Sequence, residues 1–370
     1  MAKIAVIGAS YLQQPLVLKA KEMGHLVICF AWREGAVCAD IADRFYPVSI
    51  VEKEQILAIC EEEKIDGICT IASDVAAPTV AYVAEHLGLR GNSYEAACRA
   101  NDKFQMREAF SKANLPCPQY RLIDTVSQLY EESWNYPLIV KPVDRSGSLA
   151  VMKVHNFEDL HIAVLEAQKV SFKHLAIVES FVEGREISVE FISYNGHHYP
   201  LQITDKITTG APHFVELEHH QPADLSNEMF EQIYSLTAKA LDALGVTDGA
   251  SHSEYKITFD GNPVIMEIGA RMGGDFIGSD LVQLSTGYDF LKGVINVALG
   301  AFEIPVLFNQ GCSGIYFFCK ETERLTNQVF NQKCFEIVRM EYPQKPLIEV
   351  SRSSDRVGYF IYKSKKRMML

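Results

Sequence analysis

Short apolar runs alternate with amphipathic stretches through the first ninety residues of the chain. Runs that are apolar throughout predict strands buried on both faces, at Ile4–Gly8, Leu26–Ala31 and Asp66–Ala72. The stretches between and after them predict helices, at Tyr11–Met23, Glu52–Glu63 and Val75–Leu87. Strands buried on both faces are typical of parallel sheets covered by helices on each side. We therefore expect an α/β domain at the front of the chain.

The pattern changes after Asn101. A helix over Asp102–Ala113 and a proline-marked linker precede three predicted strands, at Pro137–Val140, Ala150–Val154 and Leu175–Val178. We expect a helix over Phe157–Gln168, an alternating strand over Glu186–Ser193 and a helix that begins at Ser226 and ends before Gly245. The last seventy residues predict short strands again, at Gly314–Cys319, Cys334–Met340 and Val357–Tyr362.

Composition and charge narrow the function classes. The chain has 370 residues, 48% apolar and 22% charged, with a formal net charge of −12. Such a negative field disfavours polyanions, so we expect no nucleic-acid partner, although a few local cations suffice for a small phosphate ligand. The nine cysteines form no C-x-x-C pair, and no apolar run has the length of a membrane span. We expect a cytoplasmic protein with reduced cysteines and no membrane partner.

The most informative segment is the predicted hairpin around Asp260-Gly261. A two-residue turn there places Glu254 directly opposite Glu267, with Cβ atoms roughly 4.5–5.5 Å apart. Either both carboxylates face water, or they share a divalent cation, for which all-oxygen ligands favour magnesium or calcium. A glycosidase acid pair is a further alternative. Because opposed like charges repel, replacing Glu254 by glutamine should leave the fold unharmed or slightly more stable. Arg271 has the parity of Glu267 and so projects from the same face.

Two other segments suggest phosphate and nucleotide contacts. A strand ends at Lys141 and is followed by the small-residue loop Ser146-Gly147-Ser148, which is no Walker A loop because it leads into a strand. Its backbone N–H groups could face phosphate oxygens, or the loop is only a turn. The other segment is a strand that carries Glu179, followed by a linker and a strand that begins at Glu186. These residues either bind a purine nucleotide, or their carboxylates simply lie on the solvent-exposed face of a sheet.

In order and spacing, these segments together resemble the ATP-grasp superfamily of carboxylate–amine ligases. The front domain looks like the domain preceding the grasp in carbamoyl phosphate synthase and biotin carboxylase, and the closing segment Glu267–Asp275 is similar to that of L-amino acid ligases. The resemblance implies a Rossmann-like domain over residues 1–93, an ATP-grasp domain over 94–300 with a lid at about 118–178, and a small β-rich module over 301–370.

The resemblance also implies roles for individual residues. Lys103 and Lys141, with the loop Ser146-Gly147-Ser148, would hold the ATP phosphates, and Glu254 and Glu267 would bind Mg²⁺, for which Mn²⁺ substitutes. Glu179 and the backbone of Phe181 and Val182 would hold adenine, and Glu186 the ribose. Arg271 would act on the transferring phosphoryl group. On the substrate side the resemblance points to Lys206, His219, Gly273 and Gly274.

One residue departs from the family pattern. Many members carry asparagine where this chain has Gly269, on the side shared with Glu267, so one oxygen ligand of a second metal is missing. With an asparagine at this position, less magnesium should be needed for activity.

The implied activity is ATP-dependent amide formation. ATP would phosphorylate a carboxylate, an amine would attack the acylphosphate, and ADP and phosphate would be released. We expect amino-acid-like carboxylate and amine substrates. The alternatives are a carbamoyl-phosphate-synthase-like or purine-pathway enzyme that activates bicarbonate, formate or a ribonucleotide, and a non-catalytic ATP-binding regulatory module. The oligomeric state stays open, with a homodimer as one alternative.

Overall fold

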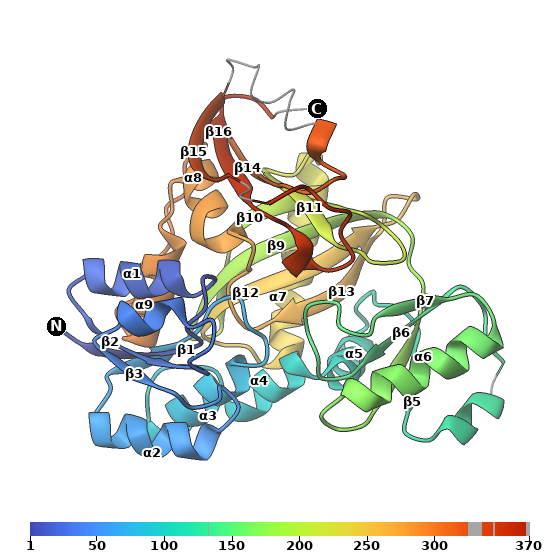
Figure 1. Ribbon diagram of the computed structural model, residues 1–370, viewed down its shortest axis with the longest axis horizontal. Coiled ribbons are helices and arrows are strands. Elements are labelled where there is room, and N and C mark those ends of the chain that lie inside the picture. The colour runs from blue at the N-terminus through green and yellow to red at the C-terminus, as the bar shows by residue number, and fades with distance from the viewer. Residues whose placement is uncertain (132, 325–334, 343–344, 368–370) are drawn as a thin grey trace.

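The computed structural model describes residues 1–131, 133–324, 335–342 and 345–367 of the chain. Its strands form three sheets, ordered β3-β2-β1-β4, β5-β8-β6-β7 and β13-β12-β9-β10-β11-β14-β16-β15. Figure 1 shows the front domain in blue, the lid in green on the opposite side, and the eight-stranded central sheet above them. In the described part of the chain, no helix combines the length and apolar character needed to cross a membrane.

The front domain is built on a parallel sheet, as its continuous apolar runs predicted. Its strands are β1 (Lys3–Ile7), β2 (Leu26–Phe30), β3 (Arg44–Tyr46) and β4 (Gly67–Cys69), and all neighbours pair in parallel. Successive side chains of a strand point to opposite faces. Ala5 and Ile7 therefore pack under α2 (Lys53–Glu63) and α3 (Ala77–Leu87), whereas Ile4 and Val6 belong to the core on the other face.

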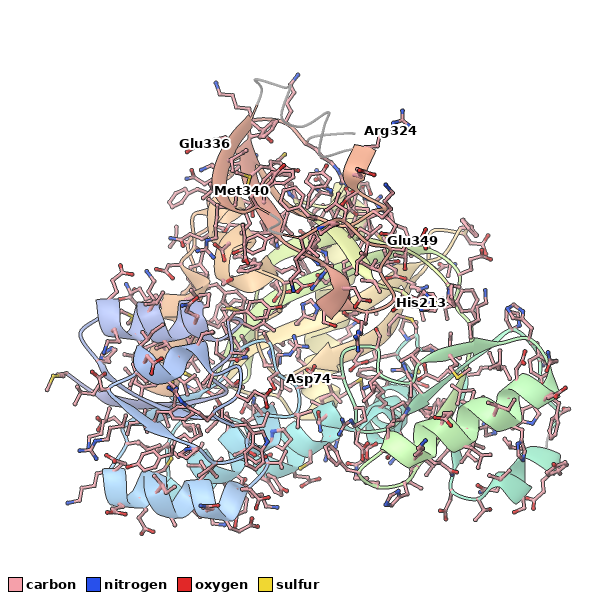
Figure 2. The ribbon with its side chains drawn as sticks, in the orientation of Figure 1. Asp74, His213, Arg324, Glu336, Met340 and Glu349 are labelled. Carbon is pink, nitrogen blue, oxygen red and sulfur yellow. The ribbon has the colours of Figure 1, made fainter. Side chains whose placement is uncertain are left out.

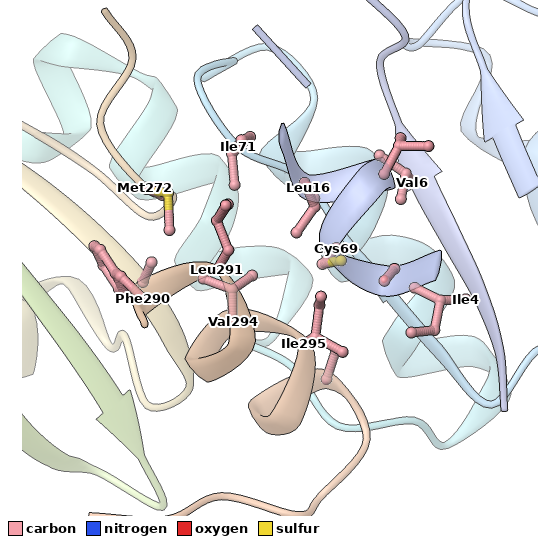
Figure 3. Close-up of a cluster of buried hydrophobic side chains, with 14 of the residues drawn as sticks. Ile4, Val6, Leu16, Cys69, Ile71, Met272, Phe290, Leu291, Val294 and Ile295 are labelled. Atoms are coloured by element: carbon pink, nitrogen blue, oxygen red, sulfur yellow. The ribbon is translucent and has the colours of Figure 1, made fainter. Parts of the chain in front are cut away.

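That other face is covered by two helices from opposite ends of the chain. One is α1 (Gln14–Glu22), and the other is α9 (Phe290–Ala298), which the sequence analysis did not predict. Figure 3 shows Ile295 of α9 beside Cys69, with Leu291 and Val294 next to it, whereas Phe290 lies on the far side of the helix toward Met272. The front sheet therefore completes the burial of this face only when a helix some 200 residues later in the chain is in place over β4.

The lid is a four-stranded antiparallel sheet with one helix. Its strands are β5 (Tyr120–Ile123), β6 (Leu138–Pro142), β7 (Met152–Val154) and β8 (Ala176–Ser180). The helix α6 (Phe157–Val170) begins at Asn156, whose side chain accepts a hydrogen bond from the Asp159 backbone, and buries its apolar stripe on the sheet. The three predicted lid strands and the predicted helix are thus all present.

The central sheet carries the rest of the chain. Its strands are β9 (Arg185–Tyr194), β10 (His197–Thr208), β11 (Glu216–Gln221), β12 (Gly249–Ile257), β13 (Pro263–Gly269), β14 (Cys312–Phe317), β15 (Phe335–Glu341) and β16 (Tyr359–Ser364). Two helices, α5 (Lys103–Lys112) and α7 (Asn227–Leu244), share its main core. The predicted C-terminal strands correspond to β14, β15 and β16, and they extend this sheet; Cys334, the predicted start of β15, lies outside the described residues.

Shorter helical segments connect these elements. They are α4 (Tyr94–Asn101), α8 (Val282–Thr286), η1 (Val37–Asp40), η2 (Val126–Tyr130), η3 (Ile277–Leu281) and η4 (Ser353–Asp355).

The hairpin of β12 and β13 differs from the prediction at its tip and agrees with it at the carboxylates. The loop has three residues, with the Gly261 N–H bonded to the Thr258 carbonyl and Gly261 at φ +79°, so Ile257 pairs with Pro263 and not with Val264. A bulge between Glu254 and Tyr255 then shifts the register by one residue. The two offsets cancel, and Glu254 lies opposite Glu267 as predicted.

Candidate active site

A cavity of about 440 Å³ lies where the front domain, the lid and the central sheet meet. Figure 2 labels one of its lining residues, Asp74, near the centre of the view. The lining includes nearly all the residues singled out from the sequence: Lys103, Lys141, Ser146, Gly147, Ser148, Glu179, Phe181, Val182, Glu186, Lys206, His219, Glu254, Glu267, Arg271 and Gly274. Gly273 lies behind this lining, and its backbone N–H donates to Glu190 Oε2 at 3.1 Å.

Two buried lysines face the cavity from different elements. Lys103 is the first residue of α5, directly after the N-cap Asp102; its Nζ donates to the Arg145 carbonyl at 2.7 Å and lies 3.0 Å from Glu267 Oε1. Burial opposes the charge of Lys103, but Glu267 outweighs it and raises the pKa. For Lys141, on β6, burial prevails over Glu179 and lowers the pKa. An anionic ligand would relieve the charge burial at Lys141.

Glu179 is enclosed by cations. Its side chain is 1% exposed, with Lys141 Nζ 2.8 Å from Oε2 and Arg107 Nε 2.8 Å from Oε1. Burial alone would raise the pKa of Glu179, but the charges of Arg107 and Lys141 lower it. Both oxygens are thus engaged by cations, and the carboxylate holds Lys141 in place.

The sequence analysis missed Arg107. Its guanidinium is fully buried and also donates to the Met266 carbonyl at 2.6 Å, which joins α5 to β13. Helical spacing could have identified Arg107, because Lys103 and Arg107 are four residues apart and therefore share one face of the helix.

The predicted nucleotide pocket contains an aromatic ring between two lysines. Lys153 Nζ lies 3.6 Å and Lys256 Nζ 5.1 Å from the centroid of Phe181. Glu186, at the start of β9, forms an ion pair with Lys256 at 3.2 Å. Gly147 and Ser148 are exposed at the lid side of the same cavity.

The opposed glutamates are each paired with a lysine. Lys206 Nζ lies 2.5 Å from Glu254 Oε1, and Lys103 Nζ lies 3.0 Å from Glu267 Oε1. Burial would raise the pKa of Glu254, but Lys206 and His252 hold it well below the usual range. The repulsion expected between the two carboxylates is therefore largely neutralised, which reverses the expectation that a Glu254→Gln change leaves the fold unharmed.

These carboxylates fit a magnesium ion that is shared with a phosphate ligand. Both side chains line the cavity and remain partly exposed, 38% for Glu254 and 27% for Glu267. In the described part of the chain, no three His, Cys, Asp or Glu side chains gather in a way that would hold a metal alone. A two-carboxylate site suits magnesium, which keeps water and phosphate oxygens in its shell.

Arg271 reaches the cavity at the end of β13 and meets the front domain there. Its Nη2 donates to Asp74 Oδ2 at 2.7 Å, a contact between residues 197 positions apart that no local sequence pattern predicts. A Cβ added to Gly269 would lie 2.3 Å from Asp74 Oδ1. The expectation that an asparagine at Gly269 lowers the magnesium requirement holds only if the strand tolerates that side chain, and the carboxylate of Asp74 occupies the space it would need.

A buried pair supports Glu254 from behind. His252 Nδ1 is paired with Glu190, which is fully buried, and His252 Nε2 lies 3.4 Å from Glu254 Oε1. Burial alone would lower the pKa of His252, but Glu190 and Glu254 raise it to about 9. His252 precedes Glu254 by two residues on β12, so strand parity was the signal for this second missed residue.

The substrate-side candidate His219 lies near Arg356, which follows η4 close to the C-terminal end of the chain. His219 is buried, 3.7 Å from Asp275 Oδ2, and burial lowers its pKa. Arg356 binds Asp275 through two hydrogen bonds of 2.7 and 2.9 Å and stacks 3.7 Å from the centroid of Phe317. Arg356 was not predicted. Lys206 is paired with Glu254 and lies 3.8 Å from Glu216.

Residues 134–280 match the ATP-grasp domain family. This stretch holds Lys141, the loop Ser146–Ser148, both opposed glutamates and Arg271. Over residues 134–280 the ATP-grasp resemblance inferred from the motifs is therefore confirmed.

One curated relative and one solved structure are ligases to which this chain is similar. Alanine–anticapsin ligase of Bacillus subtilis (strain 168) is 30% identical over 245 residues, which are 60% of this chain and 51% of that protein. The chain thus spans about half the length of the curated relatives it matches. The crystal structure of L-amino acid ligase from Bacillus licheniformis superposes with a TM-score of 0.81 at 24% identity, covering 98% of this chain and 94% of that one.

The fold of this chain is also similar to that of a synthetase of a different kind. Phosphoribosylglycinamide synthetase from Anaerococcus prevotii gives a TM-score of 0.76 at 20% identity, covering 98% of this chain and 94% of that one. These likenesses confirm the predicted fold, an α/β front domain with an ATP-grasp body.

Proposed function

We propose that the protein is an ATP-dependent carboxylate–amine ligase that joins amino-acid-like substrates and releases ADP and phosphate. The observation that carries the proposal is the pair Glu254 and Glu267, directly opposed on β12 and β13, in one cavity with buried Lys103 and Lys141 and with Arg271. Two carboxylates that suit magnesium, in one cavity with two buried lysines, suit the phosphates of a nucleoside triphosphate.

In this proposal one part of the cavity binds the phosphates and another part binds the purine. Lys103 and Lys141 hold the phosphates, and Glu179 with Arg107 fixes the ammonium group of Lys141. The backbone of Phe181 and Val182 faces the purine. The carboxylate of Glu179 is engaged by cations, so it supports the phosphate site in place of the adenine contact first expected.

The proposed reaction has two steps. A substrate carboxylate oxygen bonds to the terminal phosphorus while the bond from that phosphorus to the bridging oxygen of ADP breaks. Arg271 stabilises the charge on the transferring phosphoryl oxygens. The amine nitrogen then bonds to the acyl carbon, the acyl carbon–oxygen bond breaks, phosphate leaves, and a proton from nitrogen passes to phosphate or water. Magnesium held by Glu254 and Glu267 would neutralise phosphate charge.

The lid closes the site in this scheme. Water must be excluded because it would hydrolyse the acylphosphate. The loop Ser146–Ser148 lines the cavity from the lid, which suits it to cover the phosphates.

The relatives support amino-acid-like substrates, since two are named as ligases of alanine or of L-amino acids. The test is phosphate release by the purified protein across paired amino acids, with chromatography of the nucleotide. ADP formed only when two amino acids are present supports the proposal. AMP and pyrophosphate as products refute it. Turnover with bicarbonate, formate or a ribonucleotide, and none with amino acids, would assign the protein to the purine-pathway or carbamoyl-phosphate alternative.

A matched pair of variants distinguishes ADP release by this protein from ADP release by contaminating ATPases. Glu267→Gln removes a carboxylate of the proposed metal pair and should abolish ADP release. Glu166→Gln, on the exposed side of α6, changes charge equally and should leave it unchanged. Equal activity of both variants would mean that the measured turnover is not this protein's.

A further inference from the structure

Asp74 brings a carboxylate from the front domain into the cavity. It follows β4, and its side chain meets Arg271 Nη2 at 2.7 Å, with exposed fractions of only 14% and 13% for the two side chains. Burial would raise the pKa of Asp74, but Arg271 lowers it, so the pair is ionised. Such a pair in a poorly solvated place fixes a guanidinium more firmly than a surface ion pair does.

The backbones on either side of this pair are locked together. Ile71 forms a parallel bridge with Met272, and the Ala72 N–H donates to the Met272 carbonyl at 3.0 Å. A Cβ on Gly274 would touch the Cβ of Ala72 at 3.3 Å. The segment that carries Asp74 is therefore held at a fixed distance from the one that carries Arg271.

The space for the carboxylate exists because position 269 is glycine. Asp74 Oδ1 lies 2.3 Å from where a Cβ of residue 269 would be, closer than any side chain tolerates. Gly269 and Asp74 are thus complementary, since the residue that lacks a side chain makes room for the residue that binds Arg271.

The contacts leave part of the guanidinium available. Arg271 Nη2 is bound to Asp74 and Nη1 donates to the Met272 carbonyl at 3.3 Å. Among the described residues, the buried Nε of Arg271 has no hydrogen-bond partner. Asp74 and Met272 thus take one N–H each of Nη2 and Nη1, which leaves the second N–H of each nitrogen for an anion that enters the cavity.

We infer that Asp74 is a positioning residue that holds Arg271 toward the transferring phosphoryl group, so that the front domain supplies part of the catalytic geometry. This inference rests on the proposed function. Because a guanidinium displaced by about 1 Å loses much of its effect on a transition state, loss of Asp74 should lower kcat and leave ATP binding nearly intact.

A double-mutant cycle tests the inference. Asp74→Asn, which keeps the shape of the side chain, should lower kcat for ADP release about tenfold or more and change KM for ATP less than about twofold. In an Arg271→Lys background the same change should cost less than about twofold, because residues that act as one unit are not additive. Asp40→Asn breaks the exposed Arg33–Asp40 pair of the same domain, 3.0 Å long, and should leave kcat unchanged.

Three outcomes would overturn the inference: an unchanged kcat in Asp74→Asn, effects of Asp74→Asn and Arg271→Lys that multiply, or a rise only in the KM of a carboxylate or amine substrate. Gly269→Ala offers a second route to the same geometry, because its Cβ must displace Asp74. It should reproduce the kcat loss of Asp74→Asn and add little to it. Full activity of Gly269→Ala would also refute the inference.

Binding of ADP with aluminium fluoride, which mimics a transferring phosphoryl group, separates this inference from the proposed function. The affinity should fall in Asp74→Asn and Arg271→Lys, and the double variant should bind no worse than Arg271→Lys alone. If the wild type makes no amide but the cycle on this complex is non-additive, the ligase proposal fails and the role of Asp74 stands. If turnover occurs and the cycle is additive, the role of Asp74 fails alone.

Discussion

The ion pairs of Glu254 predict that Glu254→Gln destabilises the fold. The change leaves Lys206, whose side chain is 7% exposed, without its nearest carboxylate and removes a partner of protonated His252. Breaking a fully buried ion pair by removing one partner costs about 3–5 kcal/mol.

Two features of the structure reduce this cost. The side chain of Glu254 is 38% exposed, so water replaces part of the lost contact, and Glu216 still lies 3.8 Å from Lys206. Relief of the repulsion between Glu254 and Glu267 returns about 0.5 kcal/mol. We therefore expect a net loss of about 1–2 kcal/mol in the free energy of unfolding.

Urea unfolding at pH 7 with a chelator present measures this change without metal or nucleotide. Glu216→Gln serves as the matched control, because it removes the more distant carboxylate of Lys206 and should cost less than half as much. If Glu254→Gln is as stable as the wild type or more so, repulsion between the glutamates dominates, and the neutralising role given to Lys206 must be abandoned.

Three further predictions follow from buried charges. His252 has a folded-state pKa of about 9, above its usual 6.5, because its carboxylate partners outweigh burial. The stability that it contributes is complete below pH 6.5 and is lost as pH rises through 9, so the free energy of unfolding should fall by on the order of 3 kcal/mol over that window. His252→Gln should flatten the pH profile of the free energy of unfolding measured in urea. Arg107→Met should raise KM for ATP about tenfold by freeing Glu179 and Lys141, whereas an unchanged KM would show that the buried network does not position the lysine. Gly269→Asn should lower Tm by several degrees in a thermal scan because the new side chain collides with Asp74, and an unchanged Tm would contradict the close contact.

Much of the architecture was predictable because local patterns specify it. Apolar runs gave the parallel front sheet, and strand parity gave the shared face of Glu267 and Arg271. The opposition of Glu254 and Glu267 was predicted correctly although the turn was not, because a three-residue loop and a bulge each shift the register by one residue. Loop length and bulges depend on local backbone choices that a hydrophobic pattern does not encode.

Other features depend on tertiary contacts with no local signal. The strand β10 was missed because polar His197, His198 and Gln202 interrupt its apolar positions. The contact of Asp74 with Arg271 joins two domains, and only the docked backbones reveal it. Arg107 and His252 were within reach, since helix and strand periodicity places each beside a predicted site residue.

The cover that α9 provides for the front sheet has a consequence for biosynthesis. On the ribosome the front domain is finished when α3 ends at Leu87, yet the part of one apolar face that α9 covers, over β4, stays bare until Ala298 has been made. At about 5–20 residues per second, the roughly 200 residues between them take on the order of 10–40 s. For that time the nascent chain presents the apolar surface around Cys69 to water, a natural target for a holding chaperone. Slow translation of the second half of the message should therefore lower the yield of folded protein more than slow translation of the first.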